Sequence, residues 1–416
     1  MDSLFHFCQG ESHKSTEKPC QDCAWAESSE SLSMAIVCDG HGGEPYFRSQ
    51  YGSKYAVEIA KKAIHSFVDN MEESSFTVKG KRSVFEDKPF TDYGTNDGKE
   101  HEIDNHAHKA LVWLFSSIIS QWNDKIAKDA CERDLDEWEQ IHVDQKYKDD
   151  FQAKRKDPSA TFEKIYGCTL MAYVQTPTYW FAFHIGDGKC VTLHMEGNGI
   201  EFCQPIPWDE RCFLNKTTSL CDSHVLEEFR YCYQGDGKFP RAVFLGSDGM
   251  DDSYGDGENL YNFYIQLFKT IIQRGKDKAF LELKKSLPVI SKRGSKDDMS
   301  VACVYNDSAN NAMFYALTQY QMTRYEEQLN GIGEKISLLT KKIEECKEPE
   351  KLNQKEQIEL EYAKKDLARA EEQVKRIKTR KKVLKTEITK YQNRMREELT
   401  DDTPNGDDST FDMPSE

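Results

Sequence analysis

The chain has 416 residues, a formal net charge of −16 and a sequence pI of about 5.3. This length exceeds what one compact domain usually needs. The acidic balance argues against general nucleic-acid binding and gives no attraction to anionic membranes. No run approaches the roughly 20 apolar residues of a membrane span, and the first residues lack the pattern of a signal peptide. The thirteen cysteines are therefore interpreted as reduced thiols of a cytoplasmic protein.

Residues 1–38 predict short antiparallel strands around a polar loop. Residues 5–9 form the first strand, residues 10–19 the loop, and a hairpin closed by residues 27–31 follows. Cys20 and Cys23 have the spacing of a redox or zinc pair. Neither a following helix nor a second cysteine pair supports that reading.

The hairpin leads into an apolar run, residues 34–38, that predicts a buried strand ending at Asp39. Gly40 and the two glycines after His41 let the backbone turn sharply and pass close to whatever the carboxylate holds. His41 lies inside this turn, and an unperturbed histidine titrates near neutral pH. An isolated Asp-Gly after a strand is most often only a turn, so this motif alone establishes no site.

Similar acidic strand ends recur along the chain. Apolar runs 180–185 and 242–245 are followed by Asp187 and Asp248, and run 299–305 is preceded by Asp297. Adjacent antiparallel strands place the end of one beside the start of the next, so these carboxylates and Asp39 can gather on one edge. They would repel one another unless a cation neutralised them. Oxygen ligands without a Cys/His set predict magnesium or manganese rather than zinc.

Helical segments follow the first acidic turn. Residues 45–68 predict a helix, and residues 69–103 a loop or partly ordered insertion. Residues 105–150 predict one long charged helix whose apolar side packs on the sheet. The nearby histidines are interpreted as solvated rather than metal-binding; they are His101, His106 and His108.

From residue 165 the hydrophobic period changes to 2, which is typical of strands. An antiparallel meander is expected, with a hairpin turn at Asn198-Gly199. Two helices should then lead to the last strand. The expected strands are 167–175, 179–185, 189–194 and 200–203, and the expected helices are 257–274 and 277–287.

Residues 312–400 predict an antiparallel helical hairpin. Apolar residues recur at alternating steps of three and four in two segments, which indicates a coiled coil. Glu348-Pro349-Glu350 separates the segments. The second segment is longer, so its distal half should pack on the rest of the chain or on another copy. Residues 401–416 are acidic, contain no basic residue and are expected to be disordered.

Five short motifs, taken in order, resemble those of the PPM/PP2C family of metal-dependent protein serine/threonine phosphatases. The resemblance covers roughly residues 1–306 and implies an α+β fold. That fold is a β-sandwich of two antiparallel sheets flanked by helices, here followed by the C-terminal helical hairpin. The motifs are Asp39-Gly40-His41-Gly42-Gly43, Gly167-Cys168-Thr169, Gly186-Asp187-Gly188-Lys189, Ser247-Asp248-Gly249-Met250-Asp251-Asp252 and Asp297-Asp298-Met299-Ser300-Val301.

The resemblance implies a site with two Mn2+ or Mg2+ ions. Asp39 would bridge them with help from the Gly40 carbonyl, Asp248 and Asp297 would complete one ion, and Asp22 would support the other through water. Asp187, with Asp248 and Asp252, would hold a weaker third ion. A hydroxide bridging the two metals would attack the phosphorus of phosphoserine or phosphothreonine, and His41 would protonate the leaving oxygen.

Two positions depart from the family pattern. Gln21 stands where the family has the first acid of a pair, so Asp22 remains alone there. The family often has a phosphate-binding arginine shortly before that pair, but no arginine precedes Arg48. The resemblance leaves His13, Lys14 and Lys18 as possible substitutes. Residues 204–234 fall where the family carries a variable flap near the active site.

Three other functions remain open. The phosphatase-like domain could bind a phosphoprotein without turnover, as a pseudophosphatase. The coiled coil could be the main function, as a scaffold that captures a protein partner or self-associates. A metal phosphodiesterase acting on nucleotides is the third, although no base-stacking motif is evident. The implied partners are thus a phosphoprotein substrate and a partner for the coiled coil.

Overall fold

The computed structural model describes residues 1–71, 76, 80–83, 105–197, 199–206, 209, 211–212, 216–235, 237–255, 257–308, 311–346 and 353–401. The chain divides into two compact units, Met1–Ala309 and Asn310–Glu416. The strands of the first unit are β1 (Asp2–Cys8), β2 (Cys23–Ser28), β3 (Ser33–Cys38), β4 (Gly80–Ser83), β5 (Leu170–Gln175), β6 (Trp180–Ile185), β7 (Lys189–Glu196), β8 (Gly199–Cys203), β9 (Arg230–Gln234), β10 (Ala242–Gly246) and β11 (Met299–Tyr305). Its helices are α1 (Glu11–Ser15), α2 (Ser49–Asn70), α3 (Asn105–Glu132), α4 (Glu137–His142), α5 (Gln145–Lys154), α6 (Asp248–Tyr254), α7 (Gly257–Arg274) and α8 (Lys276–Arg293), with 3-10 turns at Glu44–Tyr46, Glu163–Tyr166 and Val225–Glu228.

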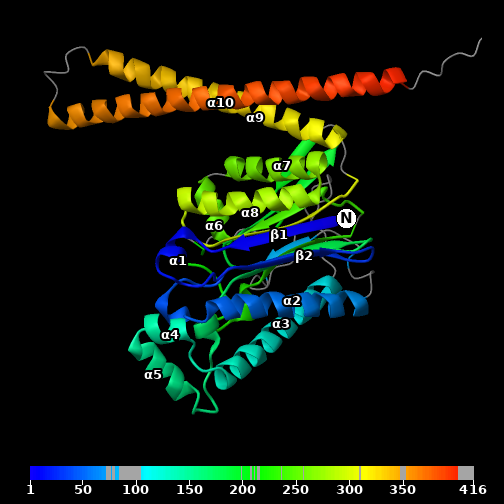
Figure 1. The fold of residues 1–416 in the computed structure, drawn as a ribbon, viewed down its shortest axis with the longest axis vertical. Coiled ribbons are helices and arrows are strands. Elements are labelled where there is room, and N and C mark those ends of the chain that lie inside the picture. The colour runs from blue at the N-terminus through cyan, green and yellow to red at the C-terminus, as the bar shows by residue number, and fades with distance from the viewer. Residues whose placement is uncertain are drawn as a thin grey trace, which may run out of the picture. The chain divides into compact units, whose positions relative to one another are not determined.

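Two antiparallel sheets form the centre of this unit (Figure 1). One has the strand order β1-β11-β10-β7-β8, and the other has β2-β3-β5-β6-β9-β4. The first and last strands are neighbours, with Asp2 opposite Tyr305. The predicted α+β sandwich is therefore confirmed.

The sheets pack through small and branched side chains, including Ala35 and Val37 of β3 and Val243 and Leu245 of β10. Helices α2 and α3 cover the six-stranded sheet, and α7 and α8 lie on the five-stranded side (Figure 1). Both faces of the central strands β3, β5, β6, β10 and β11 are thus buried, as their unbroken apolar runs predicted, whereas β8 is partly exposed.

The predicted meander is wrong at its centre. Strand β6 pairs with β5 and β9, whereas β7 pairs with β10 and β8 in the other sheet. The chain crosses between the sheets at Gly186, whose φ of +128° favours glycine. A period of 2 identifies a strand but not its partner, which is why the crossing was missed.

The predicted helix at 105–150 is in fact three helices. Helix α3 ends at Glu132, and Asp136 then starts α4 with a capping box: its side chain accepts from Glu139 N, and Glu139 bonds back to Asp136 N. At the start of α5 the Asp144 side chain accepts from Lys146 N, without a reciprocal bond. These caps favour new helix starts over a continuous helix.

The first turns of the unit also differ in detail from expectation. The predicted loop at 10–19 contains α1, and the predicted helix at 45–68 is a 3-10 turn followed by α2. In the predicted insertion at 69–103, Gly80–Ser83 form β4, which pairs with β9. Most other residues of that insertion, including His101, lie outside the described residues, as does Asn198 of the predicted hairpin turn.

Arg48 ties three helical segments together beneath the six-stranded sheet. Its side chain is fully buried and pairs with both carboxylate oxygens of Glu139, at 2.7 and 3.0 Å. It also donates to the Tyr166 hydroxyl at 3.0 Å and stacks on the Phe151 ring. Its backbone N–H donates to Ile165 O at 3.0 Å. This network fixes the segment that leads into Gly167.

The second unit contains α9 (Asn311–Glu345) and α10 (Gln354–Asp401). Tyr315 stacks on Tyr391, Glu326 pairs with Lys381 at 2.8 Å, and Lys342 approaches Glu359, so the helices are antiparallel. Their shared core is Met322, Tyr325, Ile377 and Leu384. The predicted helical hairpin is confirmed. The break at 348–350 and residues 402–416 of the predicted tail lie outside the described residues.

Across the described part of the chain, none of the helices combines the length and apolar character needed to cross a lipid bilayer.

Candidate active site

The backbone around Asp39 continues the β3–β5 ladder beyond its last regular pair. Asp39 N donates to the Thr169 hydroxyl at 3.0 Å, and Thr169 N donates to Asp39 O at 2.7 Å. Gly40 forms a bridge with Cys168, and a Cβ on Gly40 would meet Gln21 O at 2.6 Å. Asp39 and Gly40 are thus held in place by Cys168 and Thr169, which directly follow the segment that Arg48 fixes.

Two more of the predicted acids, Asp248 and Asp297, lie at the edge where the neighbouring strands β10 and β11 end and begin. Asp248 is the first residue of α6, directly after β10, and Asp297 lies just before β11. Ser300 N donates to the Ser247 hydroxyl at 3.1 Å, which holds the two segments together. A Cβ on Gly249 would lie 2.1 Å from Asp298 O, so only glycine allows this approach.

The predicted carboxylates form one electrostatic cluster. Burial, followed by the charges of Asp248 and Asp22, raises the pKa of Asp39 well above its usual range. Burial and the charge of Asp248 also raise the pKa of Asp297. The pKa of Asp22 is raised well above its usual value by burial, then by Asp298 and Asp248. The structure therefore brings together acids that lie up to 275 residues apart in the sequence, from Asp22 to Asp297.

Asp187 joins the cluster from the end of β6. Burial and then Asp248 raise its pKa to about 6, while a hydrogen bond from the Thr217 side chain opposes this rise. Asp252, one turn along α6 from Asp248, also has a raised pKa because of burial and then Asp248. Both sheets thus contribute acids to the same edge, as the strand-end pattern predicted.

Two of these acids have oxygens that fit a cation. Both carboxylate oxygens of Asp22 and Oδ1 of Asp248 are buried, and no described residue donates a hydrogen bond of good geometry to them. The Ser300 and Ser247 hydroxyls are close enough to Asp22 to oppose the rise in its pKa. A buried oxygen without a donor is costly, and a hard cation would satisfy it. Within the described residues, no three His, Cys, Asp or Glu side chains already form a finished ligand set. The acids therefore concentrate negative charge at one place and present carboxylate oxygens that could bind a cation.

Asp298 is a residue whose part in the site the sequence did not reveal. Its buried carboxylate accepts from Gly10 N and Gln21 N, each at 2.6 Å, and pairs with His13 Nδ1 at 2.9 Å. It therefore fastens the N-terminal loop to the start of β11, beside Asp297. The available signals were its position next to Asp297 and its place in the last family motif, neither of which indicated these contacts.

The structure separates the three predicted substitutes for the missing arginine. Lys14 is exposed, and His13 is engaged by Asp298. The Lys18 ammonium donates to Gly42 O, and the charges of Asp298, Asp297 and Asp39 act on it. Burial nevertheless lowers the pKa of Lys18. Lys18 is thus the candidate cation that lies at the acid cluster.

His41 lies beside the cluster under the segment 217–222. Its Nε2 is 2.7 Å from the Ser219 hydroxyl, and its ring meets Tyr46 edge-on. Ser219 Oγ also donates to Cys168 O at 3.1 Å, which leaves it to accept from His41. Burial lowers the pKa of His41 to about 4, so the free imidazole is neutral at pH 7. Ser219 belongs to the predicted flap, and no sequence spacing linked it to His41.

Gln21 occupies the position where an acid was expected. Its amide Nε2 donates to Ser49 Oγ, and Ser49 Oγ donates to His41 O at 3.0 Å. Its own backbone carbonyl accepts from the Ser53 hydroxyl at 2.6 Å. Gln21 therefore supports the Asp39–His41 turn through α2, and its side chain adds no charge to the cluster.

In metal-free buffer, Asp187→Asn is expected to raise the melting temperature at pH 7–8 but not near pH 4. Because the pKa of folded Asp187 is raised to about 6, its stabilising contribution is complete below its unfolded pKa and is lost as pH rises through 6. The gain at neutral pH should be roughly 1–3 kcal/mol. Tryptophan fluorescence suits the measurement, since every tryptophan precedes residue 310. The exposed control Asp157→Asn should show no such pH-dependent gain, and a gain at Asp187 that is constant with pH would contradict the expectation.

Comparison with known proteins places this arrangement in a family. Residues 9–288 match the family described as protein phosphatase 2C. The chain belongs to the protein phosphatase 2C family. No curated protein shows significant similarity to it.

Solved structures of serine and serine/threonine phosphatases are similar to this chain at low sequence identity. A bacterial serine phosphatase is 14% identical, with 74% of this chain and 100% of the other covered and a TM-score of 0.40. Serine/threonine phosphatase Stp1 from Staphylococcus aureus is 15% identical, with coverages of 74% and 96% and a TM-score of 0.40. The catalytic domain of PstP, solved with two manganese ions, is 13% identical, with coverages of 72% and 96% and a TM-score of 0.38.

Proposed function

We propose that this protein phosphatase 2C member hydrolyses phosphoserine and phosphothreonine in proteins, with Mn2+ or Mg2+ as cofactor. The observation that carries the proposal is the cluster of Asp22, Asp39, Asp248 and Asp297. Burial and neighbouring acids raise the pKa of Asp22, Asp39 and Asp297, and Asp22 and Asp248 have buried oxygens without a well-placed donor. Such a cluster favours binding of hard divalent cations. Family membership supports the reaction type.

The proposed metal ligands follow from this cluster. Asp39, the Gly40 carbonyl, Asp248 and Asp297 would hold two cations, and Asp22 would orient water beside them. Asp187, with Asp248 and Asp252, is proposed to hold a third. When bound, two such cations supply a water activated for attack on phosphorus at neutral pH. Removal of one carboxylate should therefore weaken both metal binding and turnover.

Two further side chains are proposed to act on the phosphoryl group. Lys18 would offset charge on its non-bridging oxygens, because the charges of Asp298, Asp297 and Asp39 all act on its ammonium. His41 would protonate the leaving seryl or threonyl oxygen. Its pKa of about 4 in the free protein must rise for this role, and a phosphoryl dianion bound alongside would raise it.

The direct test is phosphate release from phosphoserine, phosphothreonine and phosphotyrosine peptides with added Mn2+, Mg2+ or EDTA. Hydrolysis of the first two that requires metal would support the proposal. Purified, folded protein without metal-dependent turnover on any peptide would contradict it. Tight peptide binding without turnover would instead support a pseudophosphatase, a candidate that the neutral Gln21 favours.

His41→Ala is expected to lower kcat for phosphothreonine peptides by about a hundredfold but to affect an aryl phosphate much less. An alkoxide needs a proton to leave, whereas a phenolate does not, and general acid catalysis contributes about this much. Ser219→Ala should give the same selectivity at roughly tenfold, since it removes the hydroxyl that positions the imidazole. Thr217→Ser, which keeps a hydroxyl in the same segment, is the control. Equal losses on both substrates would count against the role of His41.

The two units are proposed to divide the work. Residues 1–306 would carry catalysis, and residues 312–400 would bind a protein partner or a second copy. Deletion of 312–416 should then spare peptide hydrolysis. The thirteen free cysteines are consistent with the cytoplasmic location we propose.

A further inference from the structure

Helix α10 contains a strongly basic stretch in an acidic protein. Residues 373–386 include seven Lys or Arg and no Asp or Glu, although the whole chain carries −16. Elsewhere on α10, opposite charges alternate and pair, as in Glu361–Lys365 and Asp366–Arg369. The basic stretch therefore departs from the pattern of an ordinary solvated helix.

Three lysines of this stretch share one exposed side of α10. Lys375, Lys378 and Lys382 follow at steps of three and four residues, which places them on one side of a helix. Ile377 and Leu384, each 4% exposed, instead pack on α9. We refer to Lys375, Lys378 and Lys382 as the α10 basic face.

The α10 basic face is not neutralised within its own unit. Arg376 pairs with Glu372 at 2.6 Å, and Lys381 pairs with Glu326 at 2.8 Å. In contrast, none of the three face lysines forms an ion pair with a described residue. Lys378 and Lys382 are also four residues apart, where like charges destabilise a helix. A bound polyanion would relieve this repulsion.

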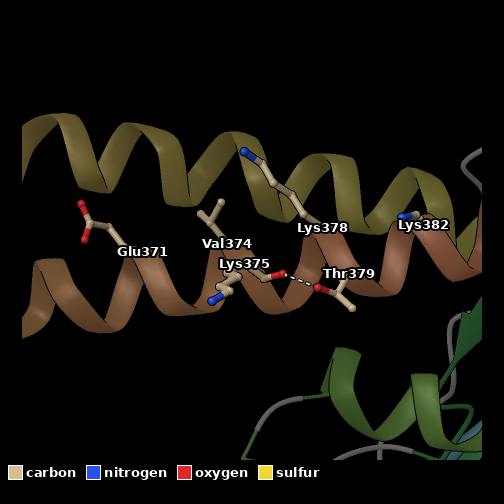
Figure 2. A pocket seen from close by; sticks show the side chains of 6 residues that line it. All are labelled: Glu371, Val374, Lys375, Lys378, Thr379 and Lys382. Carbon is tan, nitrogen blue, oxygen red and sulfur yellow. Dashed lines mark hydrogen bonds between the residues drawn. The ribbon is translucent and has the colours of Figure 1, made fainter.

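A shallow open depression of about 600 Å3 lies along these lysines. Figure 2 shows its lining along α10, in which Glu371 lies at one end, Val374 lies beside Lys375, and Thr379 lies between Lys378 and Lys382. The Thr379 hydroxyl donates its hydrogen to Lys375 O at 2.9 Å, so we do not assign it a hydrogen bond to a ligand. The depression thus offers three cations and a small apolar floor.

We infer that the α10 basic face binds an extended acidic segment of a partner protein. The lysines span about 10 Å along the helix, and an extended peptide presents same-side carboxylates about 7 Å apart, within reach of flexible lysine side chains. The Val374 floor suits one apolar side chain of that segment. Charge complementarity selects this occupant, and the inference does not depend on the proposed hydrolysis.

Other polyanions fit the same face less well. Nucleic-acid single strands bind through aromatic stacking as well as charge, and residues 373–386 contain no aromatic side chain. Insertion into a membrane surface needs a broad apolar face, and Val383 is the one large exposed hydrophobic residue within 373–386.

The test is fluorescence anisotropy with the full-length protein and a labelled peptide of about ten Asp and Glu residues with one central Leu. Lys375→Gln/Lys378→Gln/Lys382→Gln should weaken binding about tenfold at low salt. The control Lys364→Gln/Lys365→Gln/Arg369→Gln removes three exposed cations from the same helix and should stay within about twofold. Replacing the three face lysines with Arg keeps charge and helix propensity and should preserve binding.

Three outcomes would overturn the inference. The first is equal weakening by the Gln variant and its control. The second is tighter binding of a DNA oligonucleotide of equal charge, or of vesicles containing phosphatidylserine, than of the peptide. The third is a change from dimer to monomer in the Gln variant by sedimentation, without peptide binding by either form, since the occupant would then be a second copy.

Discussion

Asp39→Asn is expected to lower metal-dependent hydrolysis of a phosphothreonine peptide by about a thousandfold or more. The substitution removes a carboxylate proposed to hold the two cations, and electrostatic groups at the reacting centre are individually worth large factors. Steady-state phosphate release at saturating Mn2+ measures the loss. Turnover close to that of the unaltered protein would end the metal hypothesis.

Stability measurements can separate this loss from misfolding. Asp39 lies among acids that raise its pKa, so an amide at this position removes repulsion in metal-free protein. In EDTA the variant should therefore melt at or above the temperature of the unaltered protein. Added Mn2+ should raise the melting temperature of the unaltered protein but should raise that of the variant much less. Asp157→Asn, an exposed change outside the cluster, should behave as the unaltered protein.

Glu139→Ala is expected to destabilise the N-terminal unit by about 3–5 kcal/mol. Arg48 is 0% exposed and pairs with both Glu139 oxygens, so the change leaves a buried guanidinium without its main counter-charge. The same carboxylate also completes the capping box of α4, which adds to the loss. Urea unfolding followed by tryptophan fluorescence gives the change in free energy for this unit.

Two comparison variants sharpen that measurement. Glu137→Ala, on the exposed side of the same helix, should cost less than about 1 kcal/mol. Arg48→Met combined with Glu139→Ala should be less destabilised than Glu139→Ala alone, because the uncompensated charge is gone. If the loss in the double variant were simply the sum of two large losses, the ion pair would not be the cause of the destabilisation.

Weaker activity is also expected for Glu139→Ala, since Arg48 N donates to Ile165 O just before Gly167.

The sequence predicted the acidic edge because each acid stands at the end or start of a buried run. Strand direction then placed Asp248 and Asp297 together, and β10 and β11 are indeed neighbours. The sandwich and the helical hairpin followed from hydrophobic periodicity and the family motifs. Local patterns that repeat along the chain were thus sufficient to predict the sandwich, the helical hairpin and the acidic edge.

Other features depend on contacts that no local pattern encodes. Asp298 accepts hydrogen bonds from Gly10 and Gln21, which lie 288 and 277 residues before it in the sequence. Ser219 contacts His41 from an irregular segment that has no hydrophobic period. The crossing between sheets after β6 depends on strand partners, which periodicity cannot choose. The break in the predicted helix at 105–150 was different: Asp136 and Glu139 have the spacing of a capping box, and that signal was overlooked.

The pairing of β1 with β11 has a consequence for synthesis on the ribosome. The nascent chain must extend past Tyr305 before Asp2–Cys8 gain their partner and before Asp298 can receive Gly10 and Gln21. At ordinary elongation rates this delay is roughly 15–60 s. During this delay the N-terminal strand has an open edge, which is an aggregation hazard for the nascent chain.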